Sequence, residues 1–154
     1  MTGSDPTHER FIREALAEAE AAGEAGQLPI GAVLVLDGEI VARGRNRYLE
    51  RRTQLAHAEL EALLVGGEAA WARHDDCVLY STVEPCPMCL GAVVMADVPH
   101  VVFAAHDANA GIHHLGDNAY VARHIRTYEG GILERESLDL IARHDPRLLA
   151  YIQG

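Results

Sequence analysis

The sequence predicts an α/β sandwich built around a mixed sheet of five strands. Short apolar runs alternate along the chain with longer segments whose apolar residues repeat at helical spacing, which is typical of this fold class. Asp37-Gly38 is a hairpin turn signal, so the two strands beside it are expected to pair antiparallel. The later strand–helix–strand units have crossovers long enough for parallel pairing, and the sheet is therefore expected to be mixed.

The first half of the chain is expected to contain two helices with two strands between them. Asp5-Pro6 or Thr7 can start the first helix, and Gly23 and Gly26 end it. The run from Ile30 to Leu36 is apolar apart from Gly31, as expected of a strand covered on both faces. The next expected elements are a strand over Glu39 to Arg43, a polar loop over 44–53, and a helix over Leu55 to Val65 that Gly66-Gly67 stops.

The second half is expected to supply three more strands, with helices between and after them. The expected strands are Cys77 to Thr82, His100 to Ala105 and Arg126 to Glu129. An irregular loop is expected over 106–118. The expected helices are Cys86 to Ala96, Tyr120 to Ile125, Ser137 to Arg143, and a last one that Asp145-Pro146 caps and that ends near Ile152.

The charge of the chain is strongly negative. Lys and Arg number 13 against 23 Asp and Glu, which gives a formal net charge of −10, and there is no lysine. A charge of that sign repels phosphate backbones, so nucleic acid is not expected as a partner. Five arginines nevertheless fall within ten positions, at 43, 45, 47, 51 and 52. They form either a solvated loop or a rim that faces an anion or a substrate.

The termini and the cysteines indicate where the protein works. The first residues lack the basic start and apolar stretch of a signal peptide, and the apolar run over 30–36 is too short to span a membrane. We therefore expect one domain over 1–154, no membrane contact and a cytoplasmic location. Three cysteines in such a chain favour metal binding or catalysis over disulfide bonds.

Four residues at the starts of two predicted helices carry the chemistry. Cys86 and Cys89 are three positions apart, which places both thiols on one face of the first turn, where a helix N-terminus favours thiolates. With His57 they supply three nitrogen and sulfur ligands of the kind zinc prefers, and the fourth position stays open as in catalytic zinc sites. Glu59 is two residues from His57, so it cannot easily bind the same metal from a regular helix. It can instead transfer protons beside the metal.

At these residues the chain resembles the cytidine-deaminase-like superfamily, in particular the branch of guanine deaminases, fungal-type cytosine deaminases and bacterial tRNA adenosine deaminases. The resemblance runs from about Phe11 to Ala105. It implies a three-layer α-β-α sandwich, one Zn²⁺ per chain, and a hydrolytic deamination in which Glu59 carries protons from water to a ring nitrogen and the leaving amine. The matching segments are Pro29-Ile30-Gly31-Ala32-Val33, Gly44-Arg45-Asn46, Ala56-His57-Ala58-Glu59 and Glu84-Pro85-Cys86-Pro87-Met88-Cys89-Leu90-Gly91-Ala92.

Other interpretations of the same motifs are less complete. A structural zinc site needs a fourth ligand, and the one remaining cysteine, Cys77, lies in an apolar strand and is expected in the core. A redox CxxC pair would leave His57 and Glu59 unexplained. An inactive, zinc-stabilised interaction module would have no need of Glu59. The pair His113-His114 suggests a second metal, but histidines in a loop are more often solvated.

Three residues are expected to contact the substrate: Asn46, Ala58 and Asp107. In the family, the residue that matches Asn46 hydrogen-bonds the substrate ring, although Asn46 could also simply form a turn. Asp107 could accept a hydrogen bond from the amino group or from a ring N–H. Tyr151, on the last helix, either closes over the pocket or docks as part of an amphipathic tail.

The reaction expected from these observations is deamination of a free nucleobase or related small heterocycle, of guanine or cytosine type. The alternative is a tRNA-specific adenosine deaminase, which converts adenosine to inosine. A folded anticodon loop requires basic surface near the pocket, and the charge of −10 argues against that alternative. Relatives usually form dimers, so the resemblance also implies a homodimer.

Overall fold

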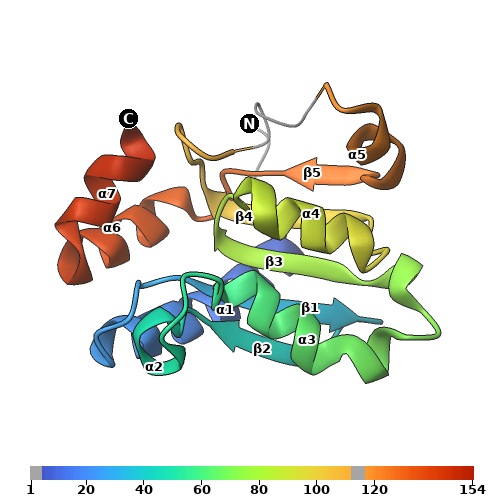
Figure 1. Cartoon of the computed structure of the whole chain (residues 1–154), viewed down its shortest axis with the longest axis horizontal. Helices are drawn as coiled ribbons and strands as arrows, with labels where there is room; N and C mark the ends of the chain where they lie inside the picture. Colours follow the sequence, from blue (N-terminus) through green and yellow to red (C-terminus); the bar gives the residue numbers. More distant parts are fainter. Residues whose placement is uncertain (1–4, 112–116) are drawn as a thin grey trace.

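The computed structural model describes residues 5–111 and 117–154 of the chain. It confirms the predicted three-layer α/β sandwich. Five strands form one sheet in the order β2-β1-β3-β4-β5, and helices cover both of its faces (Figure 1). The strands are β1 (Gly31–Leu36), β2 (Glu39–Arg45), β3 (Val78–Val83), β4 (His100–Ala105) and β5 (Thr127–Glu129).

The sheet is mixed, as the connections predict. β1 pairs antiparallel with both β2 and β3, whereas β3 with β4 and β4 with β5 pair in parallel. The hairpin between β1 and β2 turns at Asp37 and Gly38, both of which have positive φ. Two adjacent positive-φ residues match the twist of antiparallel strands, which is why an Asp-Gly pair is found there.

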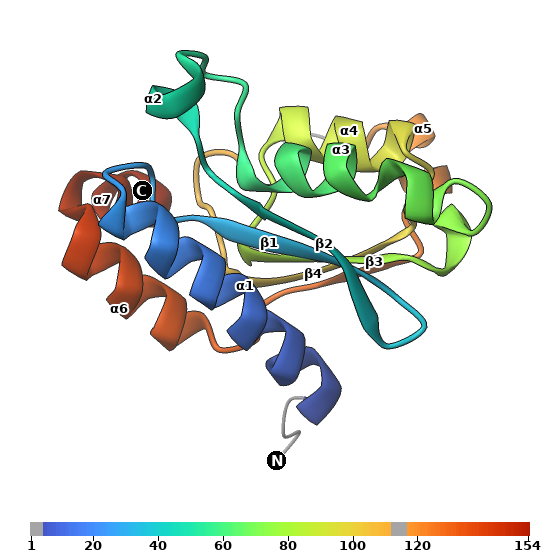
Figure 2. The same ribbon diagram turned by 90° about the horizontal axis from the view of Figure 1, so that it is seen from below.

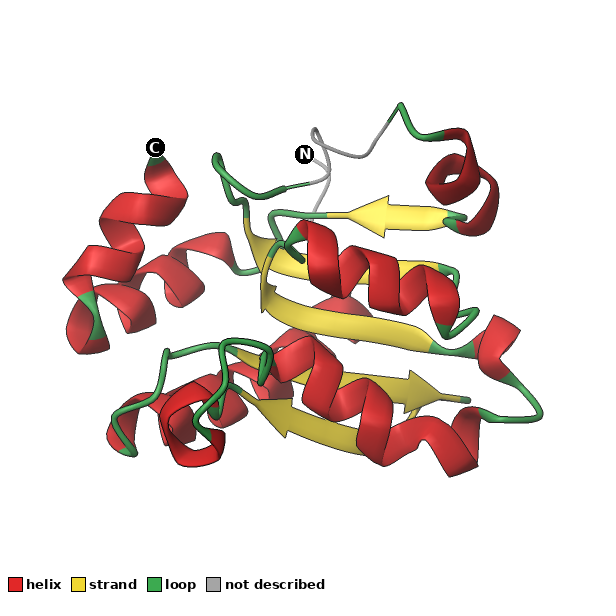
Figure 3. Ribbon diagram, viewed as in Figure 1, coloured by secondary structure: helices red, strands yellow, loops and turns green. Residues whose placement is uncertain are grey.

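The helices divide into two layers (Figures 2 and 3). The helices α3 (Ala58–Ala70), α4 (Pro87–Met95) and α5 (Ala119–His124) lie on one face of the sheet. The helices α1 (Pro6–Glu24) and α6 (Glu134–His144) lie on the other, with α7 (Pro146–Gln153) packed on α6 at one end of the sheet. No described helix is long and apolar enough to cross a membrane.

Two predicted features of the first half were wrong. Residues 44–53 are not entirely loop, because they contain the short helix α2 (Tyr48–Arg51). The helix α3 does not stop at Gly66-Gly67 but continues to Ala70. Gly66 has a packing role, since a Cβ there would lie 2.7 Å from Leu34 Cδ2 and 3.0 Å from Ala42 Cβ. The glycine lets α3 approach the hairpin closely.

The sheet is buried on both sides, which explains the continuous apolar runs. Under α3 and α4 the core contains Leu34, Leu79 and Phe103, each almost without solvent contact. Between α1 and the sheet, the core contains Phe11 of α1 and Tyr80 of β3. Cys77 lies fully buried in the first of these clusters, as its apolar surroundings in the sequence predict.

Candidate metal centre

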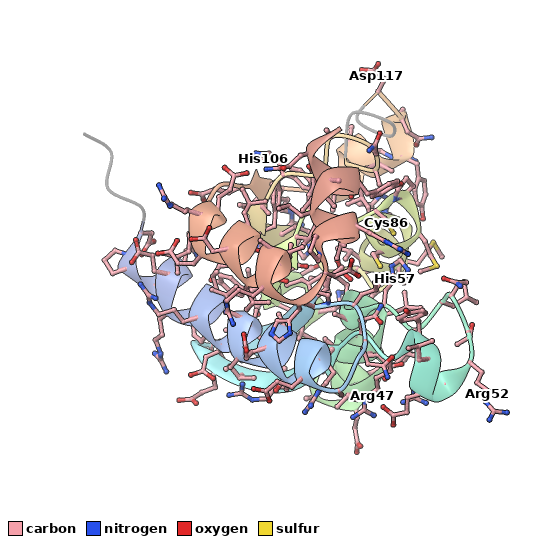
Figure 4. All side chains as sticks on the ribbon, turned by 90° about the vertical axis from the view of Figure 1, so that its left-hand side faces the viewer. Arg47, Arg52, His57, Cys86, His106 and Asp117 are labelled. Atoms are coloured by element: carbon pink, nitrogen blue, oxygen red, sulfur yellow. The ribbon has the colours of Figure 1, made fainter. Side chains whose placement is uncertain are left out.

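The structure brings His57, Cys86 and Cys89 together into a cluster of potential metal ligands. Their ligand atoms all lie within 4.8 Å of one another. Among the described residues, no other group of three or more His, Cys, Asp or Glu side chains meets this condition. Figure 4 shows His57 and Cys86 adjacent at the end of the molecule that faces the viewer. The pair His113-His114 lies outside the described residues.

The two helix starts explain why these side chains meet. His57 is the N-cap residue of α3, and Cys86 is the N-cap residue of α4, both with extended backbone. Pro87 occupies the first turn of α4, where its missing N–H costs no helical hydrogen bond. Because α3 and α4 lie side by side on one face of the sheet, their N-termini present the histidine and the two cysteines to the same point.

The spacing of the ligand atoms fits zinc. His57 Nδ1 lies 3.6 Å from Cys86 Sγ and 3.5 Å from Cys89 Sγ. A tetrahedral zinc with Zn–S of ~2.3 Å and Zn–N of ~2.0 Å places a nitrogen and a sulfur ligand about 3.5 Å apart. Two thiolates and one imidazole therefore have the separations that one Zn²⁺ requires, with a fourth tetrahedral position left for water or substrate.

The hydrogen bond between the two thiols shifts their pKa values in opposite directions. A hydrogen bond from Cys89, followed by one from His57, lowers the pKa of the Cys86 thiol to about 4. The pKa of Cys89 is raised, first by its hydrogen bond to Cys86 and then by burial. One of the two sulfurs is thus ready as a thiolate, and the second loses its proton when a cation offsets the charge.

Glu59 is a buried carboxyl group directly beside the cluster. Its Oε2 accepts a hydrogen bond from Cys89 Sγ at 3.5 Å, and its Oε1 lies 3.1 Å from the Ser81 hydroxyl. Burial is the largest cause of the raised pKa of Glu59. The Ser81 hydroxyl also lies 2.7 Å from the Val83 carbonyl oxygen. Since a hydroxyl can both donate and accept, Ser81 can support Glu59 either ionised or protonated.

A cavity of about 180 Å³ opens at the metal cluster. All three expected substrate contacts, Asn46, Ala58 and Asp107, are in its lining, together with His57 and Glu59. The Asn46 side chain also forms a turn, which was the alternative role expected from the sequence, because its Oδ1 accepts a hydrogen bond from the Tyr48 amide at 3.2 Å. Both roles proposed for Asn46 are therefore compatible with its position.

Several lining residues did not stand out in the sequence. Glu84 is buried in the wall between β3 and α4, and α7 contributes Leu148 and Ile152. Tyr151, for which the sequence suggested a place over the pocket, is in the lining as well. Glu84 lies inside the Glu-Pro-Cys motif and could have been singled out as a buried acid beside a metal ligand. Leu148 and Ile152 carry only the pattern of an amphipathic helix, which does not say what the helix covers.

The clustered arginines are mostly neutralised by neighbouring glutamates. Arg43 and Arg45 form ion pairs with α1, and Arg51 pairs with Glu61 at 2.9 Å. Arg47 lies 3.6 Å from Glu50. Arg52 forms no ion pair with the described part of the chain. Figure 4 places Arg47 and Arg52 at the margin of the end of the molecule that holds His57.

Comparison with known proteins identifies the family. The profile for the cytidine and deoxycytidylate deaminase zinc-binding region matches residues 5–105. This range contains the whole cluster and Glu59, and the chain therefore belongs to this family of zinc-binding deaminases. The family match and the cluster of His57, Cys86 and Cys89 together confirm the predicted zinc cofactor.

Curated proteins of similar sequence include tRNA-specific adenosine deaminases. The chain is 48% identical over 107 residues to the tRNA-specific adenosine deaminase of Bacillus subtilis (strain 168), a match that covers 67% of this chain and 65% of that protein. It is 42% identical over 103 residues to the tRNA-specific adenosine deaminase of Streptococcus pyogenes serotype M18, covering 66% and 64%. The matches thus span slightly less than two thirds of these relatives.

Solved structures give the same picture of the fold. A structure from a study of A-to-I editing by tRNA:A34 deaminases at the wobble position of transfer RNA superposes with a TM-score of 0.77, at 35% identity, over 85% of this chain and 98% of the other. A guanine deaminase from Nitrosomonas europaea superposes with a TM-score of 0.75 at 26% identity, over 95% and 87%.

These similarities overturn the expectation of a free nucleobase as substrate. The relatives with 42–48% identity are tRNA-specific enzymes, so the expectations of a small-molecule partner and of no nucleic acid were also wrong. The net charge misled because it sums all faces of the molecule. The layer opposite α3 and α4 contributes part of this charge, since it carries eight acidic side chains against four arginines: Glu9, Glu14, Glu18, Glu20, Glu24, Arg10 and Arg13 on α1, and Glu134, Glu136, Asp139, Arg135 and Arg143 on α6.

Proposed function

We propose that this chain is a tRNA-specific adenosine deaminase, which converts adenosine in tRNA to inosine and releases ammonia. The observation that carries the proposal is the 48% identity over 107 residues to the Bacillus enzyme of that specificity. The geometry supports it, because a metal cluster, a buried carboxyl group and a cavity meet at one point.

His57, Cys86 and Cys89 are proposed to hold one zinc ion. When bound, zinc supplies a nucleophile at neutral pH by lowering the pKa of water toward ~7. Water adds its oxygen to C6 of adenine, and the bond between C6 and the exocyclic amino nitrogen breaks to release ammonia. Glu59, which lines the same cavity, is proposed to take a proton from the attacking water and to deliver protons to the ring nitrogen and the leaving amine. Its raised pKa suits a group that must carry a proton in mid-reaction.

The walls of the cavity are proposed to orient the base. Asn46 is almost fully buried, and its amide can offer both a donor and an acceptor to the ring. Ala58 lies at the first turn of α3 between the metal ligand and Glu59, and its small side chain leaves room for the ring. Asp107 offers a carboxylate oxygen from the loop after β4.

Three expectations about the whole protein also remain proposals. They are a single domain over 1–154, a cytoplasmic location and a homodimer. The location agrees with a role on tRNA, and the homodimer rests on resemblance to the family.

The direct test is inosine formation in RNA. The zinc-loaded protein is incubated with an adenosine-containing anticodon stem-loop, and nucleosides from the digested RNA are quantified by mass spectrometry. We expect inosine to accumulate with the zinc-loaded protein, and not after zinc has been removed with a chelator. Absence of inosine with protein that carries stoichiometric zinc would refute the proposal.

A further inference from the structure

Glu84 occupies the junction between the loop after β4 and α4, which we call the metal helix because Cys86 and Cys89 lie at its start. It directly follows β3 and stands two residues before Cys86. Its backbone amide donates to the Ala105 carbonyl at 2.8 Å, which continues the β3–β4 pairing past the end of β3. Its side chain is buried and lies in the wall of the cavity.

The carboxylate of Glu84 is bonded on both oxygens. Its Oε2 accepts a hydrogen bond from the Asp107 backbone amide at 3.0 Å. Its Oε1 accepts from the Tyr128 hydroxyl at 2.9 Å, and Tyr128 lies in β5. One side chain therefore joins the start of the metal helix, the loop after β4 and the edge strand of the sheet.

The loop from 107 to 111 is built around this carboxylate. The Asp107 side chain accepts at Oδ1 from the amides of Asn109 and Ala110, both at 2.9 Å. Gly111 donates from its amide to the Asp107 carbonyl at 3.2 Å. A Cβ at Gly111 would lie 2.4 Å from Glu84 Oε2, so the loop packs on the carboxylate too closely for any side chain at 111.

We propose that Glu84 is a positioning residue, which fixes the loop 107–111 against the metal helix so that Asp107 faces the bound substrate. Because Oδ1 of Asp107 is used inside the loop, Oδ2 is the oxygen left for a hydrogen-bond donor on the substrate. Glu84 sets where that oxygen lies. It acts through Asp107, whereas Glu59 acts on protons. The kinetic part of this proposal rests on the proposed deaminase function.

The test compares Glu84→Ala with the shape-preserving Glu84→Gln. The alanine variant loses both hydrogen bonds, while glutamine can accept from the Asp107 amide and donate to the Tyr128 oxygen. Hydrogen bonds to charged groups are among the stronger ones, so we expect KM for the anticodon stem-loop to rise about tenfold to a hundredfold in Glu84→Ala, with a much smaller change in kcat. We expect Glu84→Gln to stay near the wild type and zinc content to be unchanged in both.

Two further variants guard against a general folding defect. Gly111→Ala pushes on the carboxylate without removing it, and we expect it to raise KM as Glu84→Ala does. Glu134→Ala is the matched control, because Glu134 Oε1 accepts from the neighbouring His106 amide at 3.0 Å but lies outside the cavity. We expect its KM to be that of the wild type.

A second measurement is independent of substrate. Amide hydrogen exchange of the segment 106–111 should become faster in Glu84→Ala and Gly111→Ala, and stay slow in Glu84→Gln. Unchanged exchange in Glu84→Ala, or loss of zinc with a fall in kcat at constant KM, would overturn the proposal. So would a Glu84→Gln variant as impaired as Glu84→Ala. A wild type that forms no inosine would refute the proposed function alone, and the exchange data would still decide the role of Glu84.

Discussion

At the scale of single residues, Glu59 combines burial with contact to a metal ligand. It lies beside Cys89 and Ser81 and contributes no atom to the ligand cluster. We predict that Glu59→Gln lowers kcat for inosine formation by about a hundredfold to ten-thousandfold, because the amide cannot carry the proton. The variant should keep its zinc, as measured by metal analysis. A zinc-free Glu59→Gln protein would mean that Glu59 is a ligand, and near-normal turnover would remove its catalytic role.

The cysteines are predicted to be required for the metal rather than for the fold of the sheet. Cys86→Ala and Cys89→Ala each leave two ligands, which are too few for tight zinc binding. We expect less than one zinc per chain after dialysis, with a full complement in a Cys77→Ala control, since Cys77 lies in the core away from the cluster. Full zinc in both cluster variants would contradict the assignment.

The sequence was sufficient to find the metal cluster, because each ligand lies in a short motif at a helix start. It was less informative about the cavity walls. Glu84 and Tyr128 are 44 positions apart, and only the parallel pairing of β3, β4 and β5 brings them together. Such a contact depends on register, which a single sequence does not specify.

At the scale of elements, α3 contains two adjacent glycines with opposite environments. A Cβ at Gly66 would meet Leu34 and Ala42, whereas a Cβ at Gly67 would meet nothing within 4 Å. We predict that Gly67→Ala raises the free energy of unfolding by up to about 1 kcal/mol through helix propensity. Gly66→Ala should lower it, because overpacking costs about 1–3 kcal/mol. Chemical denaturation of both variants tests this, and equal stabilisation would show that the packing can relax.

The contact between α1 and α6 gives a prediction about pH. Glu20 accepts hydrogen bonds from Arg143 at 3.1 Å and pairs with His144 at 2.9 Å. The hydrogen bond from Arg143, and then the one from His144, lower the pKa of Glu20 below its usual 4.5. A depressed folded-state pKa stabilises the protein above the unfolded value, and this stabilisation disappears as pH falls through the folded value.

Thermal unfolding of the wild type and Glu20→Gln should therefore differ at pH 7. The difference should shrink as the pH falls below 4.5 and vanish once Glu20 is protonated in the folded state. A difference that is constant over this range would show that the carboxylate charge is not involved.

The number of strands, the antiparallel hairpin and the parallel pairing of the later strands could be predicted from the sequence, whereas the antiparallel pairing of β1 with β3 and the ends of the helices could not. The Asp37-Gly38 turn fixes the hairpin, and buried strands are recognisable by their apolar runs. Helix α3 continues beyond Gly66 because the close packing of the helix on β1 and β2 at this residue outweighs the low helix propensity of glycine. Propensity describes a local preference, and here tertiary packing overrides it.

At the scale of the whole molecule, net charge was a poor guide to substrate. The value of −10 is a sum over all faces of the sandwich, and part of it comes from α1 and α6, which lie on the face opposite α3 and α4. What matters for RNA is the local charge of the surface that it contacts, and Arg52, which forms no ion pair with the described part of the chain, lies at the margin of the end of the molecule that holds His57. The proposal of tRNA as substrate rests instead on the similarity to tRNA-specific adenosine deaminases.

One competition experiment measures whether the protein acts on tRNA or on a free base. The zinc-loaded protein is given equimolar anticodon stem-loop, guanine and cytosine at low and at physiological salt, and inosine, xanthine and uracil are quantified together. We predict inosine in the stem-loop and neither of the other products, with slower turnover at higher salt because phosphate contacts are screened. Xanthine or uracil without inosine would contradict the account.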